Sequence, residues 1–337
     1  MKMSRRSFGK LALAAGAATV GAPYIGRAAE PIVIKFSHVV APDTPKGRGA
    51  DKFKELAEKY TAGAVKVEVY PNSQLYKDKE ELEALQLGAV QMLCPSLSKF
   101  GPLGISKFES FDLPYMFADR TALTKITKGA IGAEMMATLA PKGISGLGFW
   151  DNGFKVMSAN SPLRVPDDFL GLKMRIQSSK VLEAQMKALG AVPQVMAFSE
   201  VYQALQTGVV DGTENPPSNM LTQKMNEVQK HATLSHHGYL GYAAIANKPF
   251  WDGLPAEIRK EVDKAMAEAT DYNNEIAAAD NKAATETMMK AGTTQFHEQT
   301  ADERAAWIKV LMPVHAEMSE RIGKDLVDRM HKELGIG

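Results

Sequence analysis

Two polar residues, Arg175 and Asn215, lie close to the predicted ends of two strands. Residues 171–219 alternate short β-like runs with helical patterns, which predicts two successive βα units. Arg175 lies in the first strand, KMRI, and Asn215 lies in the Gly-Thr-Glu-Asn-Pro-Pro turn that is expected to end the second. Ligands of open α/β sheets bind beyond the carboxyl ends of the strands, and a guanidinium grips a carboxylate through two charge-assisted hydrogen bonds. Both residues are therefore candidates for an anion site, although Arg175 could instead form a surface ion pair.

Strands and helices also alternate before this stretch, which predicts a mainly parallel sheet covered by helices. Val65, Val67 and Val69 alternate with charged residues, which is typical of a half-buried strand. The expected strands cover residues 32–36, 65–69, 90–94 and 143–150, and the expected helices cover residues 46–60, 79–87 and 122–139.

The chain is expected to cross twice between two α/β domains. The first crossing falls at Asn152-Gly153, and the second falls at residues 236–238, before an apolar strand resumes. The expected division is a leader at 1–29, a first domain at 30–152 plus 239–280, and a second domain at 153–238 plus 281–337. Two crossings place a hinge beside the ligand cleft, and such clefts close by hinge motion.

The longest helical pattern covers residues 256–291. It contains no Pro or Gly, follows Pro255 and stops at Gly292. At about 1.5 Å per residue it reaches roughly 54 Å, so we expect it to run along both lobes. Thr300 opens a capping-box pattern in the last helical region, and Pro313 is expected to interrupt that region.

The first 29 residues have the composition of a signal peptide. They hold five Lys or Arg and no acidic residue, continue as an Ala/Gly-rich apolar run, and end in Arg27-Ala28-Ala29. The pair Arg5-Arg6 followed by Phe8 resembles a twin-arginine signal. The apolar run of roughly a dozen residues is too short to span a bilayer. We therefore expect export to the periplasm.

The rest of the chain has a globular composition, with 45% apolar and 23% charged residues and no basic block of the kind that binds nucleic acid. Without the five basic residues of the leader, 35 of the 40 Lys and Arg remain against 39 acidic residues, a formal charge of −4. An anion must then be bound where positive charge gathers locally. Cys94 is the single cysteine, which excludes an intramolecular disulfide, and its apolar neighbours favour a core position over a nucleophile.

Several long segments of the chain are particular enough to indicate a family: FSHVVAPDTPKG, YPNSQLYKDKEELEALQLGAVQM, FWDNGFKVMSAN, GLKMRIQSSKVLEAQ, MAFSEVYQALQTGVVDGTENPPSN and HGYLGYA. Together they resemble the solute-binding proteins of tripartite ATP-independent periplasmic (TRAP) transporters, of the C4-dicarboxylate-binding DctP type. The resemblance implies an α/β, two-lobe periplasmic binding protein fold of the TRAP type, with a long helix along both lobes. It also implies a receptor, not an enzyme and without a cofactor, that passes succinate, malate or fumarate to small and large membrane permease subunits.

The resemblance also implies roles for individual residues. It makes Arg175 the carboxylate clamp and Asn215 a pocket residue that offers both donor and acceptor groups. A diacid needs a second cation, and the candidates are Lys155, where some sialic-acid-binding relatives carry an arginine, and Lys46 at a helix start. Ser96 falls where sialic-acid-binding relatives carry an acidic residue, so a serine there avoids repelling a second carboxylate.

Ring side chains complete the candidate set. Phe198 aligns with a pocket aromatic, but it could equally form a hydrophobic staple beside Ser199, the expected helix N-cap. Trp150 and His38 end strands that face the cleft, and His237 lies at the second crossing. Each of these last three could serve a structural role instead.

Three alternative functions stay open. The ligand could be another organic acid, such as a 2-oxo acid or a monocarboxylate, or the same pocket could belong to a ligand sensor. A periplasmic enzyme is disfavoured, because the sequence has no G-x-S-x-G elbow, no H-E-x-x-H motif and no Gly-rich phosphate loop. The adjacent His236 and His237 point to opposite faces in an extended chain and make a poor metal pair.

Overall fold

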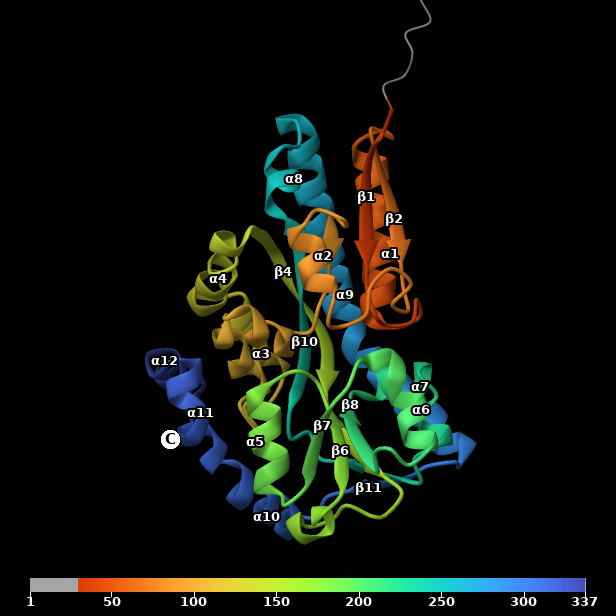
Figure 1. The fold of residues 1–337 in the computed structure, drawn as a ribbon, viewed down its shortest axis with the longest axis vertical. Helices are drawn as coiled ribbons and strands as arrows, with labels where there is room; N and C mark the ends of the chain where they lie inside the picture. Colours follow the sequence, from red (N-terminus) through yellow and green to blue (C-terminus); the bar gives the residue numbers. More distant parts are fainter. Residues whose placement is uncertain (1–29, 337) are drawn as a thin grey trace, which may run out of the picture. The chain divides into compact units, whose positions relative to one another are not determined.

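The computed structural model describes residues 30–336, so the expected signal peptide at 1–29 lies outside the described residues. Within them the chain has the expected α/β architecture, with strands gathered into two sheets and many covering helices (Figure 1). None of the described helices combines the length and the apolar composition that crossing a membrane requires.

The two sheets are both mixed. The first has the order β2-β1-β3-β10-β4, and the second has the order β11-β9-β5-β8-β6-β7. The strands of the first sheet are β1 (Ile32–Ser37), β2 (Val65–Tyr70), β3 (Met92–Leu93), β4 (Ile144–Phe154) and β10 (Tyr239–Asn247). The strands of the second sheet are β5 (Val156–Ala159), β6 (Lys173–Ile176), β7 (Val192–Val195), β8 (Gly212–Asn215), β9 (His231–Leu234) and β11 (Gln295–Glu298).

Antiparallel pairing occurs at β10, which pairs with β3 and β4, and at β5, which pairs with β8 and β9. These are the strands that carry the chain from one sheet to the other. The chain passes from β4 to β5 at Lys155 and from β9 to β10 at residues 235–238. The two passages touch, because the Lys155 N–H donates to the Gly238 carbonyl at 2.9 Å.

The helices cover the sheets and fill the connections. The α-helices are α1 (Pro45–Tyr60), α2 (Glu81–Gln86), α3 (Arg120–Thr127), α4 (Ala130–Ala137), α5 (Lys180–Ala188), α6 (Val201–Gln206), α7 (Pro217–Thr222), α8 (Lys248–Asp252), α9 (Ala256–Ala291), α10 (Ala301–Leu311), α11 (Pro313–Ile322) and α12 (Lys324–Leu334). The 3₁₀ helices are η1 (Leu97–Lys99), η2 (Gly101–Leu103), η3 (Ser106–Asp112), η4 (Ala140–Lys142), η5 (Pro166–Phe169), η6 (Phe198–Glu200) and η7 (Met225–Glu227).

Helix α9 confirms the prediction of a long helix at residues 256–291. It ends at Gly292, whose φ of 69° is the left-handed conformation that glycine adopts without strain. It packs against α1 and β4 on the side of the first sheet and against α7, which follows β8 of the second sheet (Figure 1). The Thr300 capping box and the interruption at Pro313 are also confirmed.

Three predicted elements were wrong in detail. The helix expected at 122–139 is two helices, α3 and α4, because Gly129 between them has an extended backbone. The strand expected at 90–94 shrinks to Met92–Leu93. The expected turn GTENPP is itself a strand as far as Asn215, because residues 212–215 pair with residues 156–159, and Pro217 then opens α7.

Apolar side chains form separate core clusters. One lies around β1, α1 and α9 and contains Phe36, Phe53 and the single cysteine, Cys94. Burial raises the pKa of the Cys94 thiol to about 12, which agrees with its predicted place in the core. Another cluster contains Ile144 and Ile245 of the first sheet together with apolar side chains of α11 and α12, and these helices contact η3 and α3.

Candidate functional site

Candidate residues from both sheets follow the carboxyl ends of parallel strands. Arg175 lies near the end of β6, and Asn215 ends the parallel neighbour β8. In the first sheet, His38 follows β1, and Ser96 follows soon after β3. The structure therefore supplies strand-end residues where open α/β sheets bind ligands.

Arg175 is a buried guanidinium that has no carboxylate within 4 Å among the described residues. Its Nε and Nη2 donate to the Met196 carbonyl at 3.1 and 2.8 Å, and the Phe198 ring centre lies 5.8 Å from its Cζ. Burial lowers the pKa of Arg175, but an arginine keeps its charge in proteins. The remaining N–H groups of the fork are available to an anion.

Lys46 is a second buried cation without a carboxylate within 4 Å among residues 30–336. It lies in the first turn of α1, which Thr44 caps. Its Nζ donates to the Cys94 carbonyl at 3.0 Å and lies 3.7 Å from the centre of the Tyr242 ring. Burial lowers the pKa of Lys46 to about 8. Two of its three N–H donors remain for a ligand.

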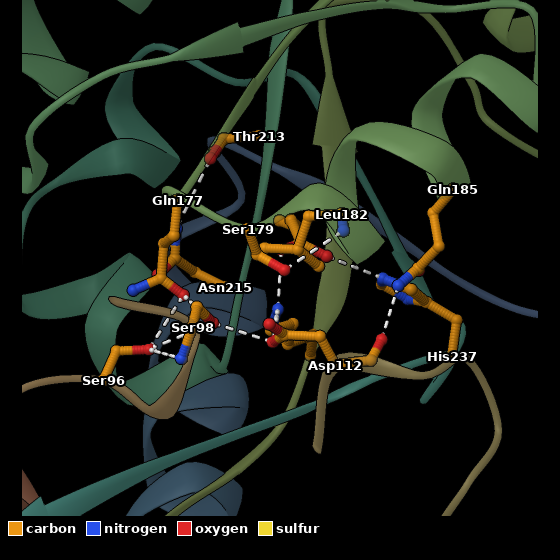
Figure 2. Close-up of polar contacts among 12 residues, drawn as sticks. Ser96, Ser98, Asp112, Gln177, Ser179, Leu182, Gln185, Thr213, Asn215 and His237 are labelled. Carbon is orange, nitrogen blue, oxygen red and sulfur yellow. Dashed lines mark hydrogen bonds and ion pairs between the residues drawn. The ribbon is translucent and has the colours of Figure 1, made fainter. Parts of the chain in front are cut away.

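A chain of polar contacts joins the surroundings of the two cations. Figure 2 shows Ser96 and Ser98 directed toward Gln177, and both serine hydroxyls lie 3.3 Å from its Oε1. Gln177 is two residues beyond Arg175, while Ser96 forms a β-bridge with Tyr242, the residue under Lys46. Residues that follow strands of both sheets thus link the neighbourhood of Arg175 to that of Lys46.

Two asparagines and His38 add neutral polar groups. Asn215 Nδ2 lies 3.4 Å from Thr213 Oγ1 (Figure 2), and Asn219 Nδ2 donates to the Tyr242 hydroxyl at 3.4 Å. Asn219 Oδ1 and both ring nitrogens of His38 are buried without a hydrogen-bond partner among the described residues. Burial and the nearby Lys46 lower the pKa of His38 to about 3, so this ring is neutral at ordinary pH.

Lys155 and His237 are both engaged with a buried carboxylate in the structure. Lys155 Nζ lies 2.6 Å from Glu214 Oε1, and His237 Nε2 lies 3.0 Å from Glu214 Oε2. Ser235 Oγ contacts the other ring nitrogen of His237 at 2.7 Å. Burial raises the pKa of Glu214, but Lys155 and His237 outweigh it and hold that pKa at about 2. Because its charge is already compensated, Lys155 is a weaker second cation for a ligand than Lys46.

Of the aromatic candidates, one lies in the core and one lies beside Arg175. Trp150 is fully buried in the core, and its Nε1 donates to Thr270 of α9 at 2.8 Å. Phe198 lies beside Arg175, with its ring centre 5.8 Å from the guanidinium carbon. Ser199 was wrongly predicted as a helix N-cap: it lies inside η6, and neither η6 nor α6 has a side-chain cap.

The sequence reasoning missed Gln177 and Tyr242. Gln177 could have been found, because it directly follows the end of β6, where the strand-end rule places ligand-binding residues. No sequence pattern marked Tyr242 as a site residue, because it lies in an apolar strand and contacts Lys46 only through tertiary packing.

Buried cations and neutral polar groups at the strand ends of two linked sheets define a receptor for a small anion. A family model described as bacterial extracellular solute-binding protein, family 7 (DctP), matches residues 36–321, and the chain belongs to this family. This is a family of solute-binding receptors, not an enzyme family.

Named relatives of this chain bind C4-dicarboxylates. The C4-dicarboxylate-binding periplasmic protein DctP of Rhodobacter capsulatus is 76% identical over 299 residues, which cover 89% of this chain and 90% of that protein. A TRAP periplasmic solute-binding protein of Shewanella oneidensis, solved with bound succinate, has a TM-score of 0.88 and 42% identity, with 90% of this chain and 99% of that chain covered. A homologue from Pseudomonas aeruginosa, solved with bound L-malate, has a TM-score of 0.83 and 44% identity. The match covers 85% of this chain and 100% of that chain.

Proposed function

We propose that this protein is the periplasmic receptor of a TRAP transporter and that it binds C4-dicarboxylates such as succinate, malate and fumarate. The observation that carries the proposal is the pair of buried cations, Arg175 and Lys46, neither of which has a carboxylate partner within 4 Å among the described residues. A buried charge costs several kcal/mol unless an opposite charge compensates it. A dianion with one carboxylate at each end can compensate both cations, one with each carboxylate.

In the proposed complex, Arg175 grips one carboxylate as a planar fork, and Lys46 holds the other as a point charge. Asn215, Ser96, Gln177 and His38 offer neutral donors and acceptors between them. The Phe198 ring borders the clamp. Lys155 and His237 support the site through Glu214, and Trp150 supports it through the core.

The two sheets are proposed to form two lobes that close on the ligand, with the passages at Lys155 and at residues 235–238 as hinges. The closed receptor then delivers its ligand to small and large membrane permease subunits. Residues 1–29 are proposed to direct export to the periplasm, and the ligand leaves the receptor chemically unchanged. Support for these steps comes from membership of the solute-binding family and from the composition of the leader.

Calorimetric titration of the mature protein, refolded to remove any bound ligand, tests the proposal. Succinate, malate and fumarate should bind one-to-one, and butyrate, which keeps a single carboxylate, should bind far more weakly. Arg175→Ala should weaken succinate binding by about 30-fold or more, because truncation of one partner of a buried charge pair costs about 2–5 kcal/mol. Lys46→Met should weaken succinate binding by a similar factor but leave the affinity for butyrate almost unchanged.

Lys187→Met is the matched control, since it removes an exposed lysine on α5. It should leave every affinity unchanged. Tight binding of 2-oxoglutarate, acetate or sialic acid in place of the C4 diacids would discard the diacid proposal. An unchanged succinate affinity in Lys46→Met would discard Lys46 as the second cation.

A further inference from the structure

The backbone at Met196–Phe198 is held from two directions. From one side, Arg175 donates two hydrogen bonds to the Met196 carbonyl. From the other, the Phe198 N–H donates to Asp78 Oδ2 at 2.8 Å. Arg175 lies in β6 of the second sheet and this backbone segment follows β7, whereas Asp78 lies between β2 and α2 beside the first sheet. The bond to Asp78 therefore connects elements of the two sheets next to the proposed clamp.

Asp78 is a fixed anion and not a mobile surface carboxylate. It forms an ion pair with Lys99, whose Nζ also lies 2.6 Å from Glu81, and the side chains of Lys99 and Glu81 are buried. The Asp78 side chain itself is only 11% exposed. Lys99 thus holds the Asp78 carboxylate in place through Oδ1, and Oδ2 is left to accept the hydrogen bond from the Phe198 N–H.

A cavity of about 590 Å³ lies against the same ion pair. Asp78 and Lys99 contribute to its wall, together with Ser178, which follows β6. Neither Arg175 nor Lys46 lines this cavity. The Asp78–Lys99 pair therefore borders this cavity, whereas the two buried cations do not.

We propose that Asp78 is a positioning residue for ligand retention: its hydrogen bond to the Phe198 N–H latches the two lobes over the bound diacid and slows its release. The proposal rests on the proposed function of the site. A carboxylate bound to Arg175 fixes the guanidinium, and the guanidinium fixes Met196 through its carbonyl. The Phe198 N–H is then presented to Asp78, so ligand binding and latching favour each other.

Stopped-flow tryptophan fluorescence with succinate tests the latch. Asp78→Ala should raise the dissociation rate by about 10- to 100-fold, the range that loss of a hydrogen bond to a charged acceptor predicts. Association should not slow, because the variant removes a negative charge from the path of an anion. Asp78→Asn keeps an oxygen that can accept the Phe198 N–H, so its dissociation rate should lie between those of the wild type and Asp78→Ala.

Lys77→Ala is the control, because Lys77 is an exposed neighbour that also reaches across to Glu200, at 3.0 Å. Its dissociation rate should stay within about twofold of the wild type, as expected for a surface ion pair. A wild-type dissociation rate in Asp78→Ala would overturn the latch, and so would an equal acceleration in Lys77→Ala.

Amide hydrogen exchange on the wild-type protein gives a second readout that does not depend on how the variants fold. Succinate should slow exchange at the Phe198 N–H, since the latch is expected to open in the free protein. Exchange that succinate does not alter would overturn the latch while leaving the receptor function intact. Absence of succinate binding to the wild type in the calorimeter would instead overturn the proposed function, and the latch with it.

Discussion

At the scale of single residues, the buried cations fall into two groups, those paired with a carboxylate and those without one. Lys155, Lys99 and Arg321 each pair with at least one buried carboxylate. Arg175 and Lys46 are as buried as Lys155 and Lys99 but are satisfied only by backbone carbonyls and aromatic rings. Desolvation makes such unpaired cations costly, so they mark the place where an external anion contributes most to stability.

The low pKa of Lys46 predicts a pH-dependent affinity. Its pKa is about 8 in the free protein, and a bound carboxylate must raise it, because an opposite charge favours the ionised form. At about pH 7 the amine is already largely protonated, so Lys46 itself adds little pH dependence there. As pH rises through 8, binding must take up a proton, and the affinity for succinate should fall by up to about tenfold per pH unit.

Calorimetry between about pH 6.5 and about pH 9.5, in buffers of different ionisation enthalpy, measures both the affinity and the proton uptake. His38 should not contribute, since burial keeps it neutral throughout this range. In Lys46→Met the weaker affinity should lose its pH dependence. A wild-type affinity that stays level up to about pH 9.5 would contradict the assignment of Lys46.

At the scale of elements, the passages between the sheets are built around the buried carboxylate of Glu214. Lys155 joins β4 to β5, His237 lies between β9 and β10, and Glu214 of β8 contacts both side chains. Helix α9 adds a further tie, because Asn281 donates to the Asn152 carbonyl and accepts from the Ser218 N–H. The hinge region is therefore held by specific polar contacts.

Breaking the Lys155–Glu214 pair should destabilise the fold more than it weakens ligand binding. Lys155→Met leaves Glu214 with His237 as its partner, and Glu214→Gln leaves Lys155 with Asp112 Oδ1 at 4.0 Å. Breaking a buried ion pair in this way typically costs about 3–5 kcal/mol of unfolding free energy. The double variant should recover much of that loss. Since Glu214 has a folded-state pKa of about 2, its contribution should be present above about pH 4.5 and disappear as the pH falls toward 2.

Urea denaturation of the two single variants and the double variant at about pH 7 gives the coupling energy, and a wild-type series down to about pH 3 gives the acid dependence. Lys180→Met is a suitable control, because its partner Glu183 is a surface neighbour on the same helix. A large loss of succinate affinity without loss of stability in Lys155→Met would restore Lys155 as a ligand contact.

At the scale of the whole molecule, a ligand that bridges elements of both sheets should stabilise the entire fold. One-site binding adds about 2.7 kcal/mol to the unfolding free energy at a ligand concentration of 100 Kd. For a chain of this size we expect a rise in Tm of roughly 5 °C with succinate. Butyrate at the same concentration should raise Tm far less, because it leaves Lys46 uncompensated.

Differential scanning calorimetry at several succinate concentrations checks this expectation, and Tm should keep rising with the logarithm of concentration above Kd. Lys46→Met at the same concentrations should show a much smaller rise. Equal effects of succinate and butyrate would indicate that only one carboxylate is recognised.

Local patterns in the sequence were sufficient for the elements and for part of the site. The absence of Pro and Gly between residues 256 and 291 predicted α9 at its observed bounds, because backbone propensity and capping are local properties. The strand-end rule drew attention to Arg175, and the resemblance of long segments pointed to Lys46. Both side chains have the burial and the unpaired charge that an anion clamp needs.

Only the tertiary structure decided which of the candidate cations is already neutralised. Glu214 meets Lys155, 59 residues away, because β5 and β8 pair antiparallel with Met157 opposite Glu214. Strand register depends on the packing of the whole sheet, so no local pattern distinguishes the paired Lys155 from the unpaired Lys46. The same holds for Asp78 and the Phe198 N–H, whose hydrogen bond spans 120 residues. Residue type and spacing thus determined which side chains can bind an anion, and the folded packing determined which of them remain unpaired.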